Sequence, residues 1–440
     1  MTAELAAEVT PPSGLRTYYT LLITQAVSSL GRYISGFAVS IWLFKQTGHA
    51  TPLALVGFFF ALPQILAGGL AGAVADRFDR RLVMLVANLG MASTSTLLLI
   101  SFMSGSFAVW HLYAITVVQA SFGALQGPAF LAATTMLVPD AHRDRANAIQ
   151  LVAGPAAGVI GPTVAGLLYA AIGVVGSIVA DIAAFLIGAV VLTFLSFPHP
   201  KQSEEGRALD GRIWKQMFSG IRHLYSRPAL LALVGYFSLV NLVIVTCTAL
   251  MAAYGLARTG SAAAMGLVFG AFNAGSVAGG LLMTAWGGTR PRIHGIMISL
   301  ILEGVFLAFA GMAQTTWLLA STLFGFGLAF PIINASFLSI FQAKIAPDVQ
   351  GRVFASIIQV SMLMAPISYL AAGPLADRVF EPARSASWWT LVAPLVGAGH
   401  GAGMGLLFVI AGVLLTVLTV AVYAAPIIRH LEARLPNHAA

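Results

Sequence analysis

The sequence predicts an all-α membrane protein of about twelve transmembrane helices, arranged as two pseudo-symmetric six-helix halves. Three observations predict this fold class. Hydrophobic residues make up 58% of the 440 residues and charged residues only 9%, which leaves too little charge to cover a soluble domain of this length. Apolar runs of spanning length recur along the chain. Short motifs recur in both halves, as in internally duplicated membrane proteins.

The N-terminal half, residues 18–197, holds the first six predicted spans. Each is an apolar run long enough to cross the hydrocarbon core as a helix. These spans are residues 18–44, 52–75, 82–103, 108–138, 146–172 and 174–197. The preceding tail, residues 1–17, carries Glu4 and Glu8 and lacks the basic start of a signal peptide. We expect this tail to remain in the cytoplasm, uncleaved.

The C-terminal half, residues 229–428, follows a polar central loop of residues 198–228 and precedes a polar tail of residues 429–440. This half again contains six apolar runs, each long enough to cross a bilayer as a helix. They are residues 229–256, 262–286, 293–312, 316–341, 353–375 and 401–428.

The basic residues predict the orientation. Of the 23 Lys and Arg residues, four fall in the loops on one side, Arg32 lies within a span, and the others fall on the opposite side. The four are Lys45, Arg258, Arg378 and Arg384. Because cytoplasmic loops carry the excess of basic residues, we expect a multi-pass protein of the cell membrane with both termini in the cytoplasm. These loops also explain the net charge of +8 without a nucleic-acid partner.

A charged turn between the second and third spans predicts a latch. Its residues are Gly72, Asp76, Arg77, Arg80 and Arg81. Glycine lets a second helix approach closely, and an aspartate at the membrane surface can cap the N-terminus of a neighbouring helix. The arginines either pair with acids on adjacent helix ends or only fix the orientation. Gly68-Gly69-Leu70, just before this turn, recurs as Gly279-Gly280-Leu281, but that copy has lost the aspartate.

The latch and the repeated halves resemble the major facilitator superfamily, whose turn reads G-x-x-x-D-R-x-G-R-R. Here Asp79 replaces the usual glycine. Further motifs resemble the drug-proton antiporter branch, which includes macrolide-efflux and enterobactin-exporter proteins. They are Gln126-Gly-Pro-Ala-Phe130, Arg145-Ala-Asn-Ala148, Val349-Gln-Gly-Arg-Val-Phe354 and the stretch from Ala372 to Pro382.

The resemblance implies a central cavity lined by the first, fourth, seventh and tenth helices, a small-molecule substrate and protons as the coupling ion. It also implies that Asp76 caps the eleventh helix near Gly351. The fourth helix departs from the family pattern, because Gly123 stands where the resemblance implies an intramembrane arginine.

Three ionisable residues lie well inside apolar runs, where charged groups are costly and are functional candidates. Arg32 either holds an anionic or carbonyl-rich substrate or pairs structurally with Glu303, Asp181 or backbone carbonyls. Asp181 and Glu303 are candidates for proton coupling, with hydrogen-bonded core groups as the alternative.

Two further groups of residues are candidates for transport. The first comprises sparse polar and aromatic residues on the expected cavity helices, each of which alternatively packs between helices: Gln25, Gln126, Tyr236, Asn241, Phe330 and Asn334. The second is a set of fifth-helix glycines and prolines that resembles the antiporter motif of exporters, with ordinary helix packing as the alternative: Gly154, Pro155, Gly158, Gly161, Pro162 and Gly166.

Together these patterns predict a secondary-active exporter of hydrophobic or amphipathic, macrolide-like compounds that works by alternating access with proton antiport. The alternatives are export of a siderophore or another secondary metabolite, or a non-transporting receptor. We expect a monomer in the lipid bilayer without enzymatic activity or cofactor. A nucleotide-driven pump is excluded because no G-x-x-x-x-G-K-[ST] loop is present. The single cysteine, Cys247, excludes a multi-cysteine metal site.

Overall fold

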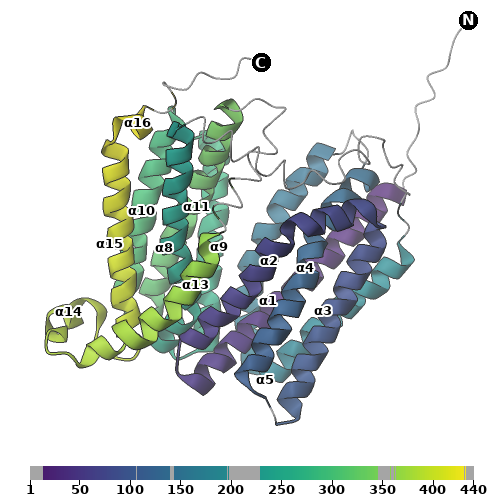
Figure 1. Cartoon of the computed structure of the whole chain (residues 1–440), viewed down its shortest axis with the longest axis horizontal. Helices are drawn as coiled ribbons and strands as arrows, with labels where there is room; N and C mark the ends of the chain where they lie inside the picture. Colours follow the sequence, from purple (N-terminus) through teal and green to yellow (C-terminus); the bar gives the residue numbers. More distant parts are fainter. Residues whose placement is uncertain are drawn as a thin grey trace, which may run out of the picture.

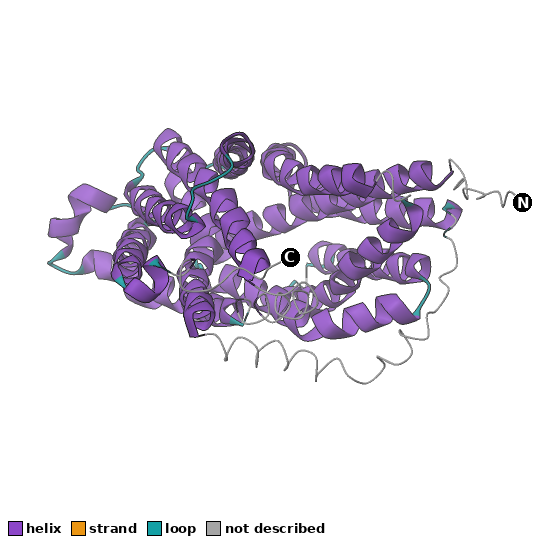
Figure 2. Cartoon of the chain, turned by 90° about the horizontal axis from the view of Figure 1, so that it is seen from above, coloured by secondary structure: helices purple, strands orange, loops and turns teal. Residues whose placement is uncertain are grey.

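A computed structural model describes residues 13–105, 107–138, 143–195, 197, 228–344, 357, 361, 363–430 and 432. Within these ranges the chain folds into helices and connecting turns, and no strand occurs among them (Figure 2). The all-α membrane fold predicted from the sequence is therefore confirmed.

The N-terminal half consists of five long helices. They are α1 (Ser13–Thr47), α2 (Thr51–Arg77), α3 (Arg80–Met103), α4 (Val109–Leu137) and α5 (Arg143–Phe194). Helix α5 covers both the fifth and the sixth predicted spans, which meet at Gly173. This glycine has φ 65° and ψ −168°, a backbone conformation that residues with a Cβ rarely adopt. The chain therefore reverses across the membrane with almost no loop.

The C-terminal half begins with four long helices, which are α8 (Pro228–Thr259), α9 (Ala262–Trp286), α10 (Arg292–Met312) and α11 (Thr316–Lys344). Shorter elements follow. They are α13 (Met364–Pro374), η2 (Leu375–Phe380), η3 (Pro382–Ser385), α14 (Trp389–Val396), α15 (Ala402–Ala424) and α16 (Pro426–Arg429). Helix α15 ends before Pro426, which cannot continue the helical hydrogen bonds, so the last span is shorter than the predicted 401–428.

Nine helices in the described ranges are long and apolar enough to cross a membrane. Each coincides with one of the twelve predicted spans. The other three predicted spans fall on α2, on the first part of α5 and on the segment that ends in α13. Within that last span, 353–375, residues 353–356, 358–360 and 362 lie outside the described residues.

The two halves approach each other at one end of the molecule, here called the narrow end, and diverge at the end that carries α16 and the start of α1 (Figure 1). Close glycine contacts join them at the narrow end. A Cβ on Gly166 of α5 would lie 2.8 Å from the carbonyl oxygen of Ala262 in α9, and a Cβ on Gly373 of α13 would lie 2.4 Å from the Cα of Thr51 in α2. Because no side chain intervenes, helices of the two halves come into backbone contact.

Candidate functional site

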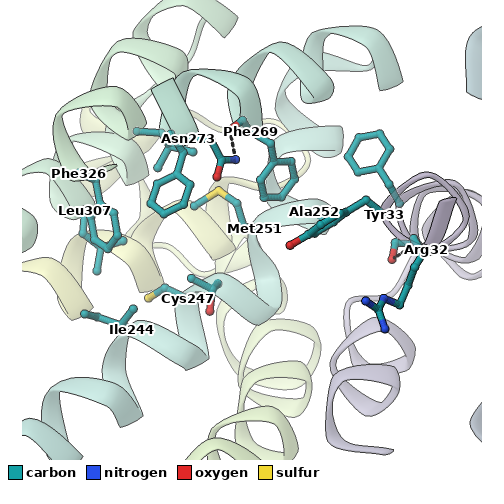
Figure 3. Close-up of a pocket in the computed structure, with 16 residues that line it drawn as sticks. Arg32, Tyr33, Ile244, Cys247, Met251, Ala252, Phe269, Asn273, Leu307 and Phe326 are labelled. Atoms are coloured by element: carbon teal, nitrogen blue, oxygen red, sulfur yellow. Dashed lines mark hydrogen bonds between the residues drawn. The ribbon is translucent and has the colours of Figure 1, made fainter. Parts of the chain in front are cut away.

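A cavity of about 450 Å³ lies between α1 of the N-terminal half and helices α8 to α11 of the C-terminal half. Figure 3 shows Arg32 and Tyr33 on the α1 side, facing the residues of the C-terminal half. Most of the wall is apolar. Its aromatic and aliphatic side chains are Phe37, Ile244, Met251, Ala252, Phe269, Phe272, Leu307, Leu323 and Phe326.

The polar groups of the wall are few, and several are already satisfied within their own helices. The Ser40 hydroxyl donates to the carbonyl of Gly36 (2.7 Å), and the Asn273 amide donates to the carbonyl of Phe269 (2.9 Å). Arg32 is the one charged residue among the lining residues that the structure describes. A ligand therefore meets a largely apolar surface with a single cationic group, an arrangement typical of small-molecule sites.

Arg32 is positioned by close packing between α1 and the second part of α5. A Cβ on the neighbouring Gly31 would lie 2.7 Å from the Cβ of Ala184 and 3.2 Å from the Cα of Asp181. This contact brings Arg32 close enough to Asp181 for the two charges to interact, although no ion pair within 4 Å joins these two described residues. Of the partners expected from the sequence, the structure thus places Asp181 beside Arg32.

Gly123 of α4 provides space for the arginine. A Cβ on Gly123 would lie 3.7 Å from Nη1 of Arg32, so the guanidinium group extends toward the position where the family resemblance implied an arginine on the fourth helix. The positive charge is therefore retained in this region, but α1 supplies it. Helix α4 itself contributes no residue to the described cavity wall.

Asp181 is the centre of a buried polar cluster. Its side chain is buried, and Oδ2 accepts a hydrogen bond from the hydroxyl of Ser95 (2.8 Å). The Ser95 oxygen in turn accepts one from the amide of Gln119 (3.1 Å). Oδ1 of Asp181 is buried and has no hydrogen-bond partner within the described part of the chain. Because Oδ2 accepts a hydrogen bond and Oδ1 accepts none from the described residues, Oδ1 is the oxygen that can take up a proton.

Glu303 is equally buried, on α10 of the opposite half. Its Oε1 has no hydrogen-bond partner among the described residues. Leu307, one turn further along α10, lines the cavity, whereas Glu303 does not. Glu303 is therefore not part of the cavity wall that the structure describes.

The other cavity candidates are not among the residues that line this cavity. Gln126 of α4 donates to Oδ1 of Asn88 on α3 (2.6 Å), and the hydroxyl of Tyr236 contacts that of Thr419 (2.6 Å). The remaining residues are partly or fully exposed and do not line the wall: Gln25, Asn241, Phe330 and Asn334. As substrate contacts, all six stay predictions.

The predicted latch residues lie at the turn between α2 and α3. The Nε of Arg81 donates to the carbonyl of Leu192 (2.8 Å), and its Nη2 donates to that of Thr193, so Arg81 binds the C-terminal end of α5. Arg77 is exposed and Arg80 is half-buried. Asp79 caps α3 by accepting from the amide of Arg81 (2.8 Å), which explains an aspartate where the family has glycine. The side chains of Gly72 and Asp76 lie outside what the structure describes.

The fifth-helix motif contributes to the cavity through Gly161. A Cβ on this glycine would lie 3.3 Å from the Cβ of Tyr33, so the residue packs behind a side chain of the wall. Gly166 forms the contact with α9 given above. The side chains of Gly154, Pro155, Gly158 and Pro162 lie outside the described residues.

Sequence reasoning missed Tyr33, Asn273 and the phenylalanines of α9. Asn273 is a polar residue inside an apolar run, a signal that was available in the sequence. Cys247 is buried and contributes to the cavity wall.

Two halves of membrane-spanning helices with a cavity of small-molecule size between them are the arrangement of a membrane transporter. The family model described as Major Facilitator Superfamily matches residues 21–369. The chain therefore belongs to the Major Facilitator Superfamily, as a multi-pass membrane protein and not an enzyme.

Similar proteins agree with this family. The chain is 27% identical over 367 residues to Macrolide efflux protein A of Streptococcus pyogenes, which covers 82% of this chain and 90% of that protein. It is 23% identical over 370 residues to Multidrug efflux pump Tap of Mycolicibacterium fortuitum, with coverage of 81% and 88%. A bacterial homolog of the human lysosomal transporter Spinster, inward-facing and unoccupied, shares the fold with a TM-score of 0.72 at 15% identity, over 97% of this chain and 98% of that one.

Proposed function

We propose that the protein exports hydrophobic or amphipathic compounds, macrolide-like drugs among them, by alternating access. The observation that carries this proposal is the apolar, aromatic cavity with Arg32 as its charged lining residue among those described. Such a surface binds a bulky ligand by contact area and orients it with a few polar contacts. The efflux relatives support export, and the basic loops support a cytoplasmic location of both termini.

The position of Asp181 beside Arg32 supports proton antiport. While Asp181 is ionised, it balances the charge of Arg32, and an amphipathic amine can enter the cavity without net repulsion. When Asp181 takes up a proton, the charge of Arg32 is unbalanced and disfavours a cationic substrate. Protonation and binding of the amine therefore oppose each other, as antiport requires. A macrolide combines such an amine with carbonyl groups that can accept hydrogen bonds from Arg32.

Transport in liposomes tests this function. Purified protein under an imposed pH gradient should move a macrolide or a lipophilic cationic dye against its own gradient, and movement should stop when the pH gradient is dissipated. A catecholate siderophore serves as the competing substrate class. Gradient-driven movement of the siderophore alone would replace the proposed substrate class, and movement of none of the three would contradict the export proposal.

The predicted latch gives a second test. Asp76→Asn should slow transport by about fivefold, because the loss of one helix cap corresponds to roughly 1 kcal/mol, while binding of the macrolide is retained. Initial transport rates and binding affinity are measured on the same preparation. An unchanged transport rate would count against a latch at Asp76.

A further inference from the structure

A carboxylate of the C-terminal half caps a helix of the N-terminal half. Oδ1 of Asp377, in η2, accepts a hydrogen bond from the amide of Ala50 (2.9 Å). Oδ2 accepts from the amide of Thr51 (2.7 Å) and from its hydroxyl (2.5 Å). These donors form the N-terminus of α2, where free amide groups and the positive end of the helix dipole favour an anion.

Helix α2 has no cap of its own. Its N-cap residue, Ala50, has no side-chain oxygen, and Pro52 follows in the first turn. Side-chain capping of this helix therefore comes from Asp377 across the boundary between the halves. Close packing holds the two elements in register, because a Cβ on Gly57 of α2 would lie 2.3 Å from the ring of Tyr369 in α13. The contact lies at the end where the halves approach each other (Figure 1).

The sequence around Asp377 repeats the sequence around Asp76. Ala372-Gly373-Pro-Leu-Ala376-Asp377-Arg378 matches Ala71-Gly72-Ala-Val-Ala75-Asp76-Arg77 at five of seven positions. Helix α2 contains 27 residues, so its two ends are about 40 Å apart and lie on opposite faces of the membrane. The chain thus carries two similar copies of this seven-residue stretch, one near each end of α2.

We propose that Asp377 is a second latch, which closes the end of the transporter opposite to Asp76. The Asp377 cap holds the halves together while the cavity opens toward the end opposite to the narrow end, and it must break when the cavity opens the other way. The two copies of the motif then act in alternation. This inference rests on the alternating access of the proposed function, but it does not depend on the substrate, the direction of transport or the coupling ion.

Glu381 offers a matched control. It lies four residues beyond Asp377, and its Oε1 accepts a hydrogen bond from the amide of Met404 at the start of α15 (3.1 Å). Its Oε2 pairs with Nε of Arg384 (2.8 Å). All three residues belong to the C-terminal half. Glu381→Gln therefore perturbs a carboxylate cap at the same end of the molecule without touching the boundary between the halves.

Distances between spin labels test the latch. Labels on Ser104→Cys and Ser387→Cys, two exposed positions on different halves at the narrow end, are placed in a Cys247→Ser background. Distance distributions are recorded in nanodiscs without substrate or pH gradient. Asp377→Asn should lower the ratio of the short-distance to the long-distance population by roughly tenfold, as expected for loss of a charge-assisted cap. Glu381→Gln should leave that ratio unchanged.

Thr51→Val, which removes only the hydroxyl donor, should shift the ratio in the same direction by a smaller factor, and it tests the latch even where Asp377→Asn fails to fold. Distributions for Asp377→Asn or Thr51→Val that match the unmutated background would overturn the proposal, as would an equal shift in Glu381→Gln. Because no transport is measured, failure of the export proposal in liposomes would leave this result intact.

Discussion

Asp181→Asn is expected to abolish coupling to the proton gradient while retaining the hydrogen bond from Ser95. Asparagine retains an oxygen that can accept the hydrogen bond from Ser95 (2.8 Å in the unmutated protein), but it cannot exchange a proton. The charge of Arg32 is then permanently unbalanced, as in the protonated state of the unmutated protein. Gradient-driven macrolide movement should fall by at least roughly tenfold, which corresponds to about 1.4 kcal/mol, to the rate without a gradient.

Two measurements check this prediction. Macrolide binding to the unmutated protein should strengthen as pH rises, because deprotonation of Asp181 restores the balance of charge, whereas binding to Asp181→Asn should be weak and independent of pH. Glu303→Gln is the matched control, since Glu303 is also a buried acid but lies on α10 of the other half, whereas Asp181 is the acid beside Arg32. If binding to Asp181→Asn keeps the pH dependence of the unmutated protein, Asp181 is not the coupling residue.

Arg32→Gln is expected to have the second large effect, on stability. Removal of the guanidinium leaves Asp181 buried without its neighbouring positive charge, and an uncompensated buried charge is destabilising. The second substitution, Asp181→Asn, removes that charge and should recover part of the loss. In a double-mutant cycle, residues 32 and 181 should show a coupling of roughly 0.5 to 3 kcal/mol, measured from unfolding in detergent micelles.

A second cycle provides the control. Arg32→Gln combined with Glu303→Gln should be additive, because Arg32 interacts with Asp181 and Glu303 lies in the other half. Additivity for the 32 and 181 pair would contradict the proposed interaction. A coupling free energy between residues 32 and 303 would instead favour the pairing of Arg32 with Glu303, which the sequence left open.

The sequence predicted the helices well because spanning length and apolar composition are local properties. Even the reversal at Gly173 falls between the predicted spans 146–172 and 174–197. The family, too, was accessible from short motifs in a fixed order. These features need no knowledge of which helices touch.

The pairing of side chains across helices was not accessible in the same way. Arg32 and Asp181 were both recognised as intramembrane charges, but their proximity depends on the contact of Gly31 with Ala184, which no local pattern encodes. The same holds for Asp377. Its stretch, from Ala372 to Pro382, was recognised as a family motif, yet its likeness to the Asp76 turn becomes informative only when η2 is found against α2.

The cavity wall is divided unequally between the halves. Arg32 and the α1 residues near it come from the N-terminal half, as does Asp181 behind them, whereas helices α8 to α11 supply most of the apolar surface. Under the proposed function, substrate range and energy source are encoded in separate stretches of the gene. A chimera that takes its C-terminal half from a relative should inherit that relative's substrate range and keep its own coupling. Mutations in the C-terminal half can then change the substrate range without changing the residues proposed for coupling.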